Sequence, residues 1–343
     1  MRLDLFLQPL LMGFALSASF CLLFLFLPLF QGRSWRQGVR HAGKKSLPRL
    51  GGIAMLFGFV LTVVFDSSLV ISREILGLLV GGVLVGLVGL WDDFRELSFK
   101  AQGFFQVAIA TILFIFGVHI TTIKNPLGEE LVLAGQGMLP VLLGFVVLLV
   151  WMLLVMNAVN WLDGLDGLLG GVSTITFLSI FFLSLKPEVN QPPVAILAVA
   201  AVGVTLGFLF FNFHPARILA GTAGSMFLGF LIAALAVIAG TKIATALLVL
   251  SLPVADALWV IGERLYAGVS IFQSDQRHLH YKLRDLGWSE RHVAWFFSLL
   301  TGLIAVIALS TEALGKFVAF LLILTTLFCF LLFVAHRTRK QRV

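Results

Sequence analysis

Residues 139–157 read LPVLLGFVVLLVWMLLVMN, and this apolar stretch without one charged side chain indicates a transmembrane helix. A bilayer core takes roughly 20 mostly apolar helical residues to cross. Comparable runs recur along the chain, which has 343 residues, of which 59% are hydrophobic and only 12% charged. Soluble domains carry about 25% charged residues. The composition therefore excludes a soluble protein and predicts an all-α integral membrane protein.

Scanning the chain for such runs predicts a polytopic bundle of about eleven transmembrane helices. They form one membrane-embedded domain covering residues 1–343. The first run is longer than the apolar part of a secretory signal, so we expect it to stay as a span. The two cysteines lie in apolar runs and suggest neither a disulfide nor a metal site. The expected spans are 5–30, 51–67, 74–91, 101–121, 139–157, 166–185, 193–211, 217–238, 242–262, 293–311 and 314–335.

The distribution of Lys and Arg predicts the orientation. Eighteen of the 24 fall in the tail or in loops that follow odd-numbered spans, and six lie on the other side. Cytoplasmic loops carry the excess of Lys and Arg. We therefore expect the C-terminus in the cytoplasm and the N-terminus outside. An anionic membrane surface explains the net charge of +7, and we expect no nucleic-acid partner.

The grouped carboxylates lie on the same side as most of the bases. Asp92 and Asp93 follow the third span, and Asp163 and Asp166 begin the sixth. A transporter or flippase would more typically bury ionisable groups near the bilayer midplane. The pattern instead favours chemistry at the membrane surface. The loops expected to form the active-site face are 31–50, 92–100, 157–166, 212–217 and 263–292.

Two adjacent carboxylates, Asp92 and Asp93, stand in the segment GLWDDFRELS at residues 89–98. Neighbouring carboxylates resist being ionised together unless a cation is present. Mg²⁺ held by one or two carboxylates and by substrate phosphates would meet this condition. The alternative is a solvated helix end with Arg95 and Lys100 as partners.

The segment NAVNWLDGLDGL at residues 157–168 places an amide or carboxylate at every third position. On a helix this spacing makes a slowly drifting stripe on one side. Gly164 and Gly167 would let a ligand or another backbone approach the acids closely. The alternative is a helix N-cap at Asp163 or Asp166. A cap explains one acid and leaves the other acid and the asparagines unexplained.

Three further segments are moderate to weak signals when each is taken alone. Residues 212–225, NFHPARILAGTAGS, include a small-residue run that suits helix packing. Residues 274–283, SDQRHLHYKL, form a cationic cluster that suits a pyrophosphate, or an ordinary basic loop; the absence of a second ligand pair disfavours zinc. Residues 43–52, GKKSLPRLGG, place cations where an anionic substrate would approach, or serve only as a positive-inside signal.

In their order, spacing and shared membrane side, these motifs resemble the polyprenyl-phosphate N-acetylhexosamine-1-phosphate transferase family. Phospho-MurNAc-pentapeptide translocase is a relative of this family. The resemblance covers residues 44–286, and the eleven-span map matches as well. The matching segments are PRLGG at 48–52, DDFRELS at 92–98, NAVNWLDGLDGL at 157–168, NFHPARI at 212–218 and RHLHYKL at 277–283.

The resemblance implies a reaction in the bacterial cytoplasmic (inner) membrane, at an active site that faces the cytoplasm. A polyprenyl (undecaprenyl) phosphate attacks the β-phosphorus of a UDP-N-acetylhexosamine. The products are UMP and a polyprenyl-diphosphate sugar that starts a cell-envelope glycan. Mg²⁺, or Mn²⁺ in its place, would offset the developing charge.

The same resemblance implies roles for individual residues. Catalytic roles go to Asp92, Asp93, Asp163 and Asp166, and metal binding goes to Asp92, Asp93 and Asp166. Substrate binding goes to Lys44, Lys45, Arg49, Asn160, Asn212, Arg277, His278 and His280. The small-residue stretch 81–86 suits helix packing within or between protomers, so a homodimer stays open.

Thr222 departs from the family pattern. The family resembles Gly-Asp-(Ala/Ser/Thr)-Gly-Ser here, whereas this chain has GTAGS at 221–225, so a hydroxyl stands where a Mg²⁺-binding Asp is expected. A neutral hydroxyl is a weaker ligand for a hard cation. Three interpretations stay open: Asp163 or Asp166 takes over metal binding, the chain is a weakened or inactive relative that binds UDP-sugar or polyprenyl phosphate, or it uses another substrate pair. We expect retained activity because the other acidic motifs are complete.

Overall fold

The computed structural model describes residues 4–27, 47–123, 125, 128–129, 131–133, 137–240, 242–271 and 276–341, with side chains up to Arg337 in the last helix. Lys44 and Lys45, two predicted substrate-binding residues, lie outside this part of the chain. Most of the described chain is α-helix. The helices are α1 (Asp4–Phe26), α2 (Gly51–Phe65), α3 (Arg73–Phe94), α4 (Phe99–Ile115), α5 (Met138–Trp161), α6 (Leu168–Ser184), α7 (Pro192–Asn212), α8 (Gly221–Ile238), α9 (Ile243–Val249), α10 (Ser251–Tyr266), α11 (Leu279–Asp285), α12 (Glu290–Ser310) and α13 (Ala313–Gln341).

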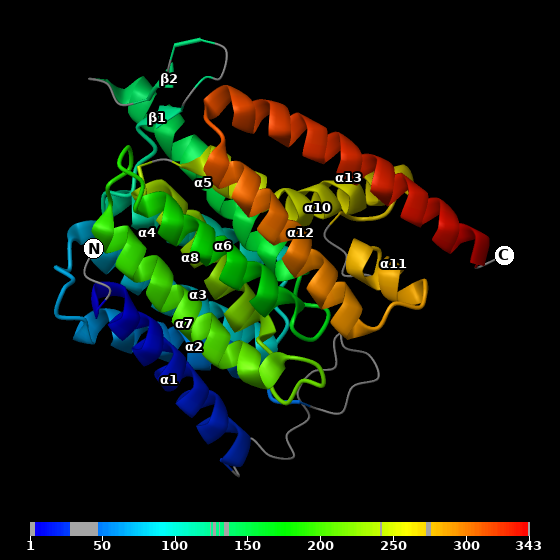
Figure 1. Ribbon diagram of the computed structural model, residues 1–343, viewed down its shortest axis with the longest axis horizontal. Coiled ribbons are helices and arrows are strands. Elements are labelled where there is room, and N and C mark those ends of the chain that lie inside the picture. The colour runs from blue at the N-terminus through cyan, green and yellow to red at the C-terminus, as the bar shows by residue number, and fades with distance from the viewer. Residues whose placement is uncertain are drawn as a thin grey trace.

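A small β-element stands outside this helical pattern. β1 (Thr122–Ile123) pairs antiparallel with β2 (Leu131–Val132) in the connection between α4 and α5. The pair projects at the edge of the molecule (Figure 1). Backbone polar groups outside a helix need partners, and a two-residue ladder supplies some of them. Apart from this pair, the predicted all-α membrane class is confirmed.

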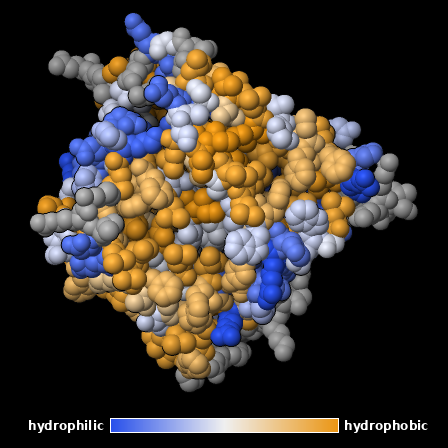
Figure 2. Space-filling model, viewed as in Figure 1, coloured by the Kyte–Doolittle hydropathy of each residue, from blue (hydrophilic) through white to orange (hydrophobic). Residues whose placement is uncertain are grey.

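Seven helices within the described residues are long and apolar enough to cross a membrane, and the bent pair α9–α10 would be an eighth. The seven are α1, α3, α5, α7, α8, α12 and α13. Three others, α2, α4 and α6, are apolar but only 15 to 17 residues long. Each of the eleven expected spans overlaps one of these helices or the bent pair. The face in Figure 2 is mostly hydrophobic, with hydrophilic patches mainly near its edges.

The expected single helix over 242–262 is instead two helices, α9 and α10, bent by 72° at Leu250. Pro253 explains the break, because a proline ring clashes with the carbonyl four residues earlier and has no N–H to donate. That carbonyl belongs to Val249, the last residue of α9. The predicted span over 242–262 is therefore not one continuous helix, although the bent pair can still form one broken span.

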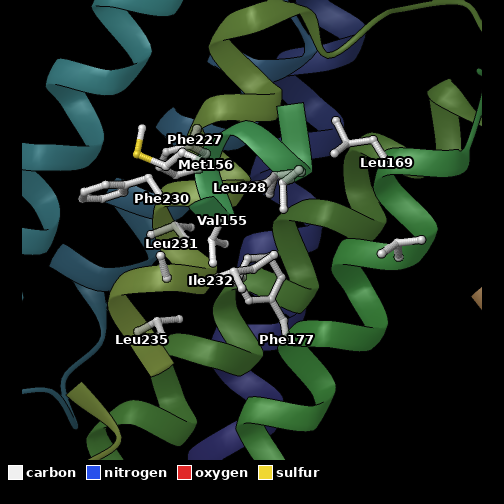
Figure 3. Close-up of a cluster of buried hydrophobic side chains, with 14 of the residues drawn as sticks. Val155, Met156, Leu169, Phe177, Phe227, Leu228, Phe230, Leu231, Ile232 and Leu235 are labelled. Carbon is white, nitrogen blue, oxygen red and sulfur yellow. The ribbon is translucent and has the colours of Figure 1, made fainter. Parts of the chain in front are cut away.

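The helix α8 runs through the centre of the bundle. It packs against α3 and α5, and 89% of its most apolar window is buried; the figure for α7, which packs between α1 and α6, is 83%. Figure 1 shows α1 and α7 side by side. In Figure 3, Val155 and Met156 of α5 meet Phe227 and Leu231 of α8 in one apolar cluster. Apolar packing against α5 therefore fixes the position of α8 within the bundle.

Serine N-caps begin three of the helices. The hydroxyls of Ser72, Ser98 and Ser289 accept backbone N–H groups in the first turns of α3, α4 and α12. Such a cap satisfies one of the N–H groups that a helix start leaves free. Ser98 closely follows the acidic pair of α3, and Ser289 directly precedes Glu290. These caps fix the backbone beside the acidic pair of α3 and beside Glu290.

Candidate active site

The buried carboxylate of Asp93, at the end of α3, lies against the start of α8. Its Oδ1 accepts the backbone N–H of Thr222 at 2.9 Å, and its Oδ2 accepts that of Ala223 at 3.1 Å. Asp93 thus caps α8 from a distant part of the chain. Gly221 has a φ of 69°, and a Cβ there would clash with the Asp93 carboxylate. Glycine meets both conditions.

The neighbouring carboxylate, Asp92, is held on both oxygens. Oδ1 accepts the Leu97 N–H and the Gln102 Nε2–H, each at 2.9 Å. Oδ2 accepts the hydroxyl of Thr222 at 2.7 Å. Thr222 therefore contacts Asp92 through its side chain and Asp93 through its backbone. The residue that departs from the family pattern lies directly at the acidic pair.

The segment 48–52 is fixed to the residues that precede α8. The N–H groups of its two glycines donate to the carbonyls of Leu219 and Ala220, both at 3.0 Å. A Cβ on Gly52 would overlap the backbone of Gly224. The two glycines thus allow α2 and α8 to approach at backbone distance, which places residue 49 beside the acidic pair.

Three more of the predicted site residues gather around the start of α8. Arg49 Nη1 lies 3.8 Å from Asp93 Oδ1. Asn160 accepts the Ser225 hydroxyl at 2.6 Å. Asp163 lies near enough to Asp93 for the two negative charges to repel each other. The end of α3, the segment 48–52, the end of α5 and the loop after it therefore converge on one helix terminus.

The predicted helical stripe over 157–166 ends halfway. Helix α5 stops at Trp161, so Asp163 and Asp166 lie in turns that follow it. The alternative N-cap role is also wrong, because the N-cap of α6 is Gly167, with a left-handed φ of 77° and no side-chain cap. Glycine readily adopts a left-handed φ. This conformation at Gly167 keeps the residues before it from continuing α6 towards the N-terminus.

Asp166 belongs to a second group of polar residues. Its Oδ2 accepts the Ala216 N–H at 3.0 Å and lies 3.0 Å from His214 Nδ1, while its own N–H donates to Glu290 at 3.3 Å. The ligand atoms of Asp166, His214 and Glu290 all lie within 4.8 Å of one another, which is compact enough for a metal ion. However, Arg291 Nε donates to the His214 carbonyl at 3.1 Å, and the positive end of α12 lies there too. These contacts favour a hydrogen-bonded network that ties the loop to α12.

Asn212, predicted to bind substrate, joins the same two loops. Its Oδ1 accepts the Gly167 N–H at 3.0 Å, and its Nδ2 donates to the Ile218 carbonyl at 2.9 Å. The buried amide thus holds the turn before α6 against the segment before α8. Its substrate-binding role stays a prediction, whereas its role in shaping the loops is visible.

The histidine segment packs against the loop that carries Asp163. His278 Nδ1 lies 2.8 Å from Asp256 Oδ2, and the His278 and His280 rings stack with centroids 5.7 Å apart. Arg277 donates to the Glu263 carbonyl at 3.3 Å. A Cβ on Gly164 would clash with the ring of His280, so these two segments touch. The predicted substrate-binding histidines therefore reach the loop of the acidic residues.

These convergent motifs have counterparts in known proteins. Residues 75–240 match the model of Glycosyl transferase family 4. The chain is 33% identical over 325 residues to a phospho-N-acetylmuramoyl-pentapeptide-transferase of Bacillus pumilus (strain SAFR-032), which covers 88% of this chain and 96% of the relative. The chain belongs to Glycosyl transferase family 4. The family resemblance seen in the motifs is confirmed.

Other relatives of this family 4 transferase carry related names. A decaprenyl-phosphate N-acetylglucosaminephosphotransferase of Mycobacterium leprae (strain TN) is 33% identical over 294 residues, 77% of this chain and 73% of the relative. A probable undecaprenyl-phosphate N-acetylglucosaminyl 1-phosphate transferase of Bacillus subtilis (strain 168) is 29% identical over 295 residues, 83% of this chain and 80% of the relative. The chain is thus an enzyme of the glycosyl-1-phosphate transferase class.

The residues at the start of α8 in the transferase fit a hard divalent cation. Asp92, Asp93 and Thr222 supply oxygen atoms, which Mg²⁺ and Mn²⁺ prefer. A carboxylate oxygen has more than one lone pair, so the existing hydrogen bonds leave acceptor capacity.

Sequence reasoning assigned no role to several polar residues of the transferase that the structure places among the predicted ones. His214 and Glu290 contact Asp166, and Asp256 contacts His278. One signal was available for Asp256, because a carboxylate in an otherwise apolar span needs a buried partner. The partner itself lies 22 residues away along the chain, which no local pattern reveals.

Proposed function

We propose that this enzyme transfers N-acetylhexosamine-1-phosphate from a UDP-sugar to polyprenyl phosphate, at the cytoplasmic face of the bacterial inner membrane. The observation that carries the proposal is the convergence of Asp92, Asp93 and Asp163 at the start of α8. Relatives named as transferases of N-acetylglucosamine 1-phosphate to undecaprenyl phosphate, and as decaprenyl-phosphate N-acetylglucosaminephosphotransferases, support it.

The proposed reaction exchanges one phosphoanhydride bond, the diphosphate bridge of the UDP-sugar, for another, the diphosphate bridge of the lipid product. An oxygen of the lipid phosphate attacks the β-phosphorus of the UDP-sugar, and the bond from that phosphorus to the bridging oxygen breaks. UMP leaves with the bridging oxygen, and the sugar stays on the phosphate that joins the lipid. Such transfers need positioning and charge neutralisation more than covalent help from the protein.

The residues divide between the two substrates. Asp92, with Asp93 beside it, serves the lipid phosphate and a divalent cation. Mg²⁺, when bound, would offset the charge of the phosphates. Cationic and imidazole side chains serve the nucleotide-sugar. This second set consists of Lys44, Lys45, Arg49, Arg277, His278 and His280.

The enzyme would lie in the membrane with eleven spans, the N-terminus outside and the C-terminus in the cytoplasm. Together with the seven long helices, the bent pair α9–α10 and the shorter helices α2, α4 and α6 would make up the eleven spans. Helices of 15 to 17 residues cross when they lie in a thinner or locally adapted part of the bilayer. All of the predicted site residues then lie on the cytoplasmic side of the membrane.

A second candidate function is that of a binding protein without turnover. Thr222 carries it, because a hydroxyl occupies the place of a metal-binding carboxylate and donates to Asp92. A turnover assay separates the two candidates. The purified protein in lipid nanodiscs is given undecaprenyl phosphate and a panel of UDP-sugars, with Mg²⁺ or with EDTA, and UMP release is measured.

Catalysis predicts UMP release that needs Mg²⁺ and falls by more than about a hundredfold in Asp92→Asn. Gly103→Ala is the matched control, since its position on α4 has open space around it. Binding of a UDP-sugar without UMP from any member of the panel would establish the non-catalytic alternative.

A further inference from the structure

Helix α10 carries three charged residues in an otherwise largely apolar sequence, and all three hold the chain that follows. Glu263 pairs with Lys282 Nζ at 2.8 Å, and Arg264 donates to the Ile271 carbonyl at 2.6 Å. Asp256 lies about two turns earlier on the same helix and is buried. A buried charge in a membrane helix is costly and is kept where it has specific partners.

Both partners of the Asp256 carboxylate lie at the start of α11. Oδ2 is 2.8 Å from His278 Nδ1, and Oδ1 accepts the Leu279 N–H at 2.7 Å. An ionised carboxylate only accepts hydrogen bonds, so His278 Nδ1 must carry the proton in this contact. The second ring nitrogen, Nε2, is then the one that faces away from Asp256.

The ring of His278 is buried on several sides. It stacks on His280 with an angle of 5° between the rings, and Trp161 lies 5.6 Å away, centroid to centroid. The Arg264 guanidinium lies 5.9 Å from the same Trp161 ring. Trp161 ends α5, two residues before Asp163. The imidazole is therefore clamped between α10 and the acidic loop, with only 4% of its side chain exposed.

In the described part of the chain, Nε2 of His278 makes no hydrogen bond, whereas Nδ1 is fully engaged. Nε2 is not among the enclosed side-chain atoms that lack a partner, so a ligand can reach it although most of the ring is buried. Since the ring cannot rotate without breaking the contact to Asp256, Nε2 keeps one direction. This combination is typical of a prearranged contact to a ligand.

We propose that Asp256 is a positioning residue of the nucleotide-sugar site, which fixes His278 so that Nε2 meets an oxygen of the UDP-sugar. The proposal rests on the proposed function, in which His278 contacts this substrate. Asp256 itself touches no substrate. It acts through the imidazole, as a carboxylate does when it orients a catalytic or metal-bound histidine.

A substitution at His278 tests the roles of its two ring nitrogens separately. In His278→Asn the amide nitrogen takes the place of Nδ1 and keeps the bond to Asp256, but nothing takes the place of Nε2. We expect a folded protein with unchanged thermal stability and a roughly tenfold weaker affinity for UDP-N-acetylglucosamine, measured by calorimetry in nanodiscs. Unchanged affinity in this variant would overturn the proposal.

Asp256→Asn tests the carboxylate. Its amide oxygen can still accept the Leu279 N–H, but the NH2 group then faces His278 Nδ1 and can only donate, so the ring is no longer held with the proton on Nδ1. We expect KM for the UDP-sugar to rise about tenfold, with kcat and KM for the lipid phosphate within about twofold. The double variant Asp256→Asn/His278→Asn should bind no more weakly than His278→Asn alone, because both changes remove the same contact.

Glu263→Gln is the matched control on the same helix. It weakens the pair with Lys282 and should add independently to His278→Asn. Additive effects of Asp256→Asn and His278→Asn, or a fall in kcat with KM unchanged, would show that Asp256 is not a positioning residue for this substrate.

A spectroscopic measurement keeps this test separate from the proposed function. In protein labelled with ¹⁵N-histidine, the His278 side chain should show a protonated Nδ1 in the wild type, and this signal should be lost in Asp256→Asn. A wild type that neither binds nor turns over any UDP-sugar would defeat the proposed function and with it the substrate contact of His278. A His278 signal without a protonated Nδ1 would defeat the positioning role itself.

Discussion

Thr222 contacts Asp92 through its hydroxyl at 2.7 Å and Asp93 through its backbone N–H at 2.9 Å. The Thr222 hydroxyl can donate a hydrogen bond to the Asp92 carboxylate. An aspartate at position 222 could not donate unless its own carboxyl group were protonated. Threonine therefore stabilises the acidic pair when no cation is present. An aspartate at position 222 would form a cluster of three carboxylates with Asp92 and Asp93, and this cluster would need a cation.

Thr222→Asp makes this reasoning testable. In EDTA the added carboxylate should lower the free energy of unfolding by roughly 2 kcal/mol, because it replaces a charge-assisted hydrogen bond with repulsion. Added Mg²⁺ should restore most of the loss. Thermal unfolding in nanodiscs, with and without Mg²⁺, measures both.

Thr222→Asn is the neutral control, and its thermal unfolding should be no more sensitive to Mg²⁺ than that of the wild type. If Thr222→Asp also unfolds at the same temperature with Mg²⁺ and with EDTA, the start of α8 does not hold a cation in the way the donor set indicates.

Between elements, α2 and α8 approach each other at backbone distance near the site. Gly52 lies against the backbone of Gly224, and the N–H groups of residues 51 and 52 donate to the carbonyls of Leu219 and Ala220. Small residues that let two backbones meet are typical of helix packing in membranes. Here the contact also places Arg49 at 3.8 Å from Asp93.

Gly52→Ala should therefore destabilise the protein by about 2–3 kcal/mol, because the added methyl group overlaps main-chain atoms that cannot move aside. The prediction is checked by thermal unfolding. Gly103→Ala, on α4 with open space around it, should change the stability by less than about 1 kcal/mol and in the stabilising direction. Equal effects of the two changes would refute the close contact.

The helices could be predicted from the sequence, but not all of the positions where they bend or end could be. Every apolar run forms a helix because backbone groups in lipid must be satisfied within the same segment. The bend at Leu250 and the end of α5 at Trp161 depend instead on Pro253, Gly164 and Gly167. These residues were visible, but a period-based reading averages over them.

The site could be predicted in part. The motifs around Asp92, Asp163 and His278 were recognised because acids and bases are rare in this chain. The pairing of Asp256 with His278 and of Asp166 with His214 was not, since each joins residues 22 or 48 positions apart. Such contacts follow from the packing of α10 and of the loops around α8, which no local spacing encodes.

At the scale of the whole molecule, the other helices pack around two buried ones, α7 and α8. The polar residues of the site lie where α3 and α5 end and α8 begins. Alternate helices of a bundle run in opposite directions, so these ends share one side. The charge distribution predicts that this side is cytoplasmic.

Cysteine labelling in cells tests the orientation. Cys21 and Cys329 are replaced by serine, and Arg95→Cys or Glu188→Cys is added, both at exposed positions. A membrane-impermeant maleimide should label Glu188→Cys in cells whose outer barrier is opened, and Arg95→Cys only after the inner membrane is also permeabilised. The reverse pattern would place the acidic residues on the outer side.

The most direct test of sugar-phosphate transfer follows one phosphorus atom. UDP-N-acetylglucosamine labelled with ³²P at the β-phosphate is incubated with the enzyme, undecaprenyl phosphate and Mg²⁺, and the lipid is extracted. The predicted result is ³²P in the lipid fraction with unlabelled UMP in the aqueous one, and loss of both in Asp92→Asn. Retention of the label in UDP, with only the sugar moved to the lipid, would contradict attack at the β-phosphorus.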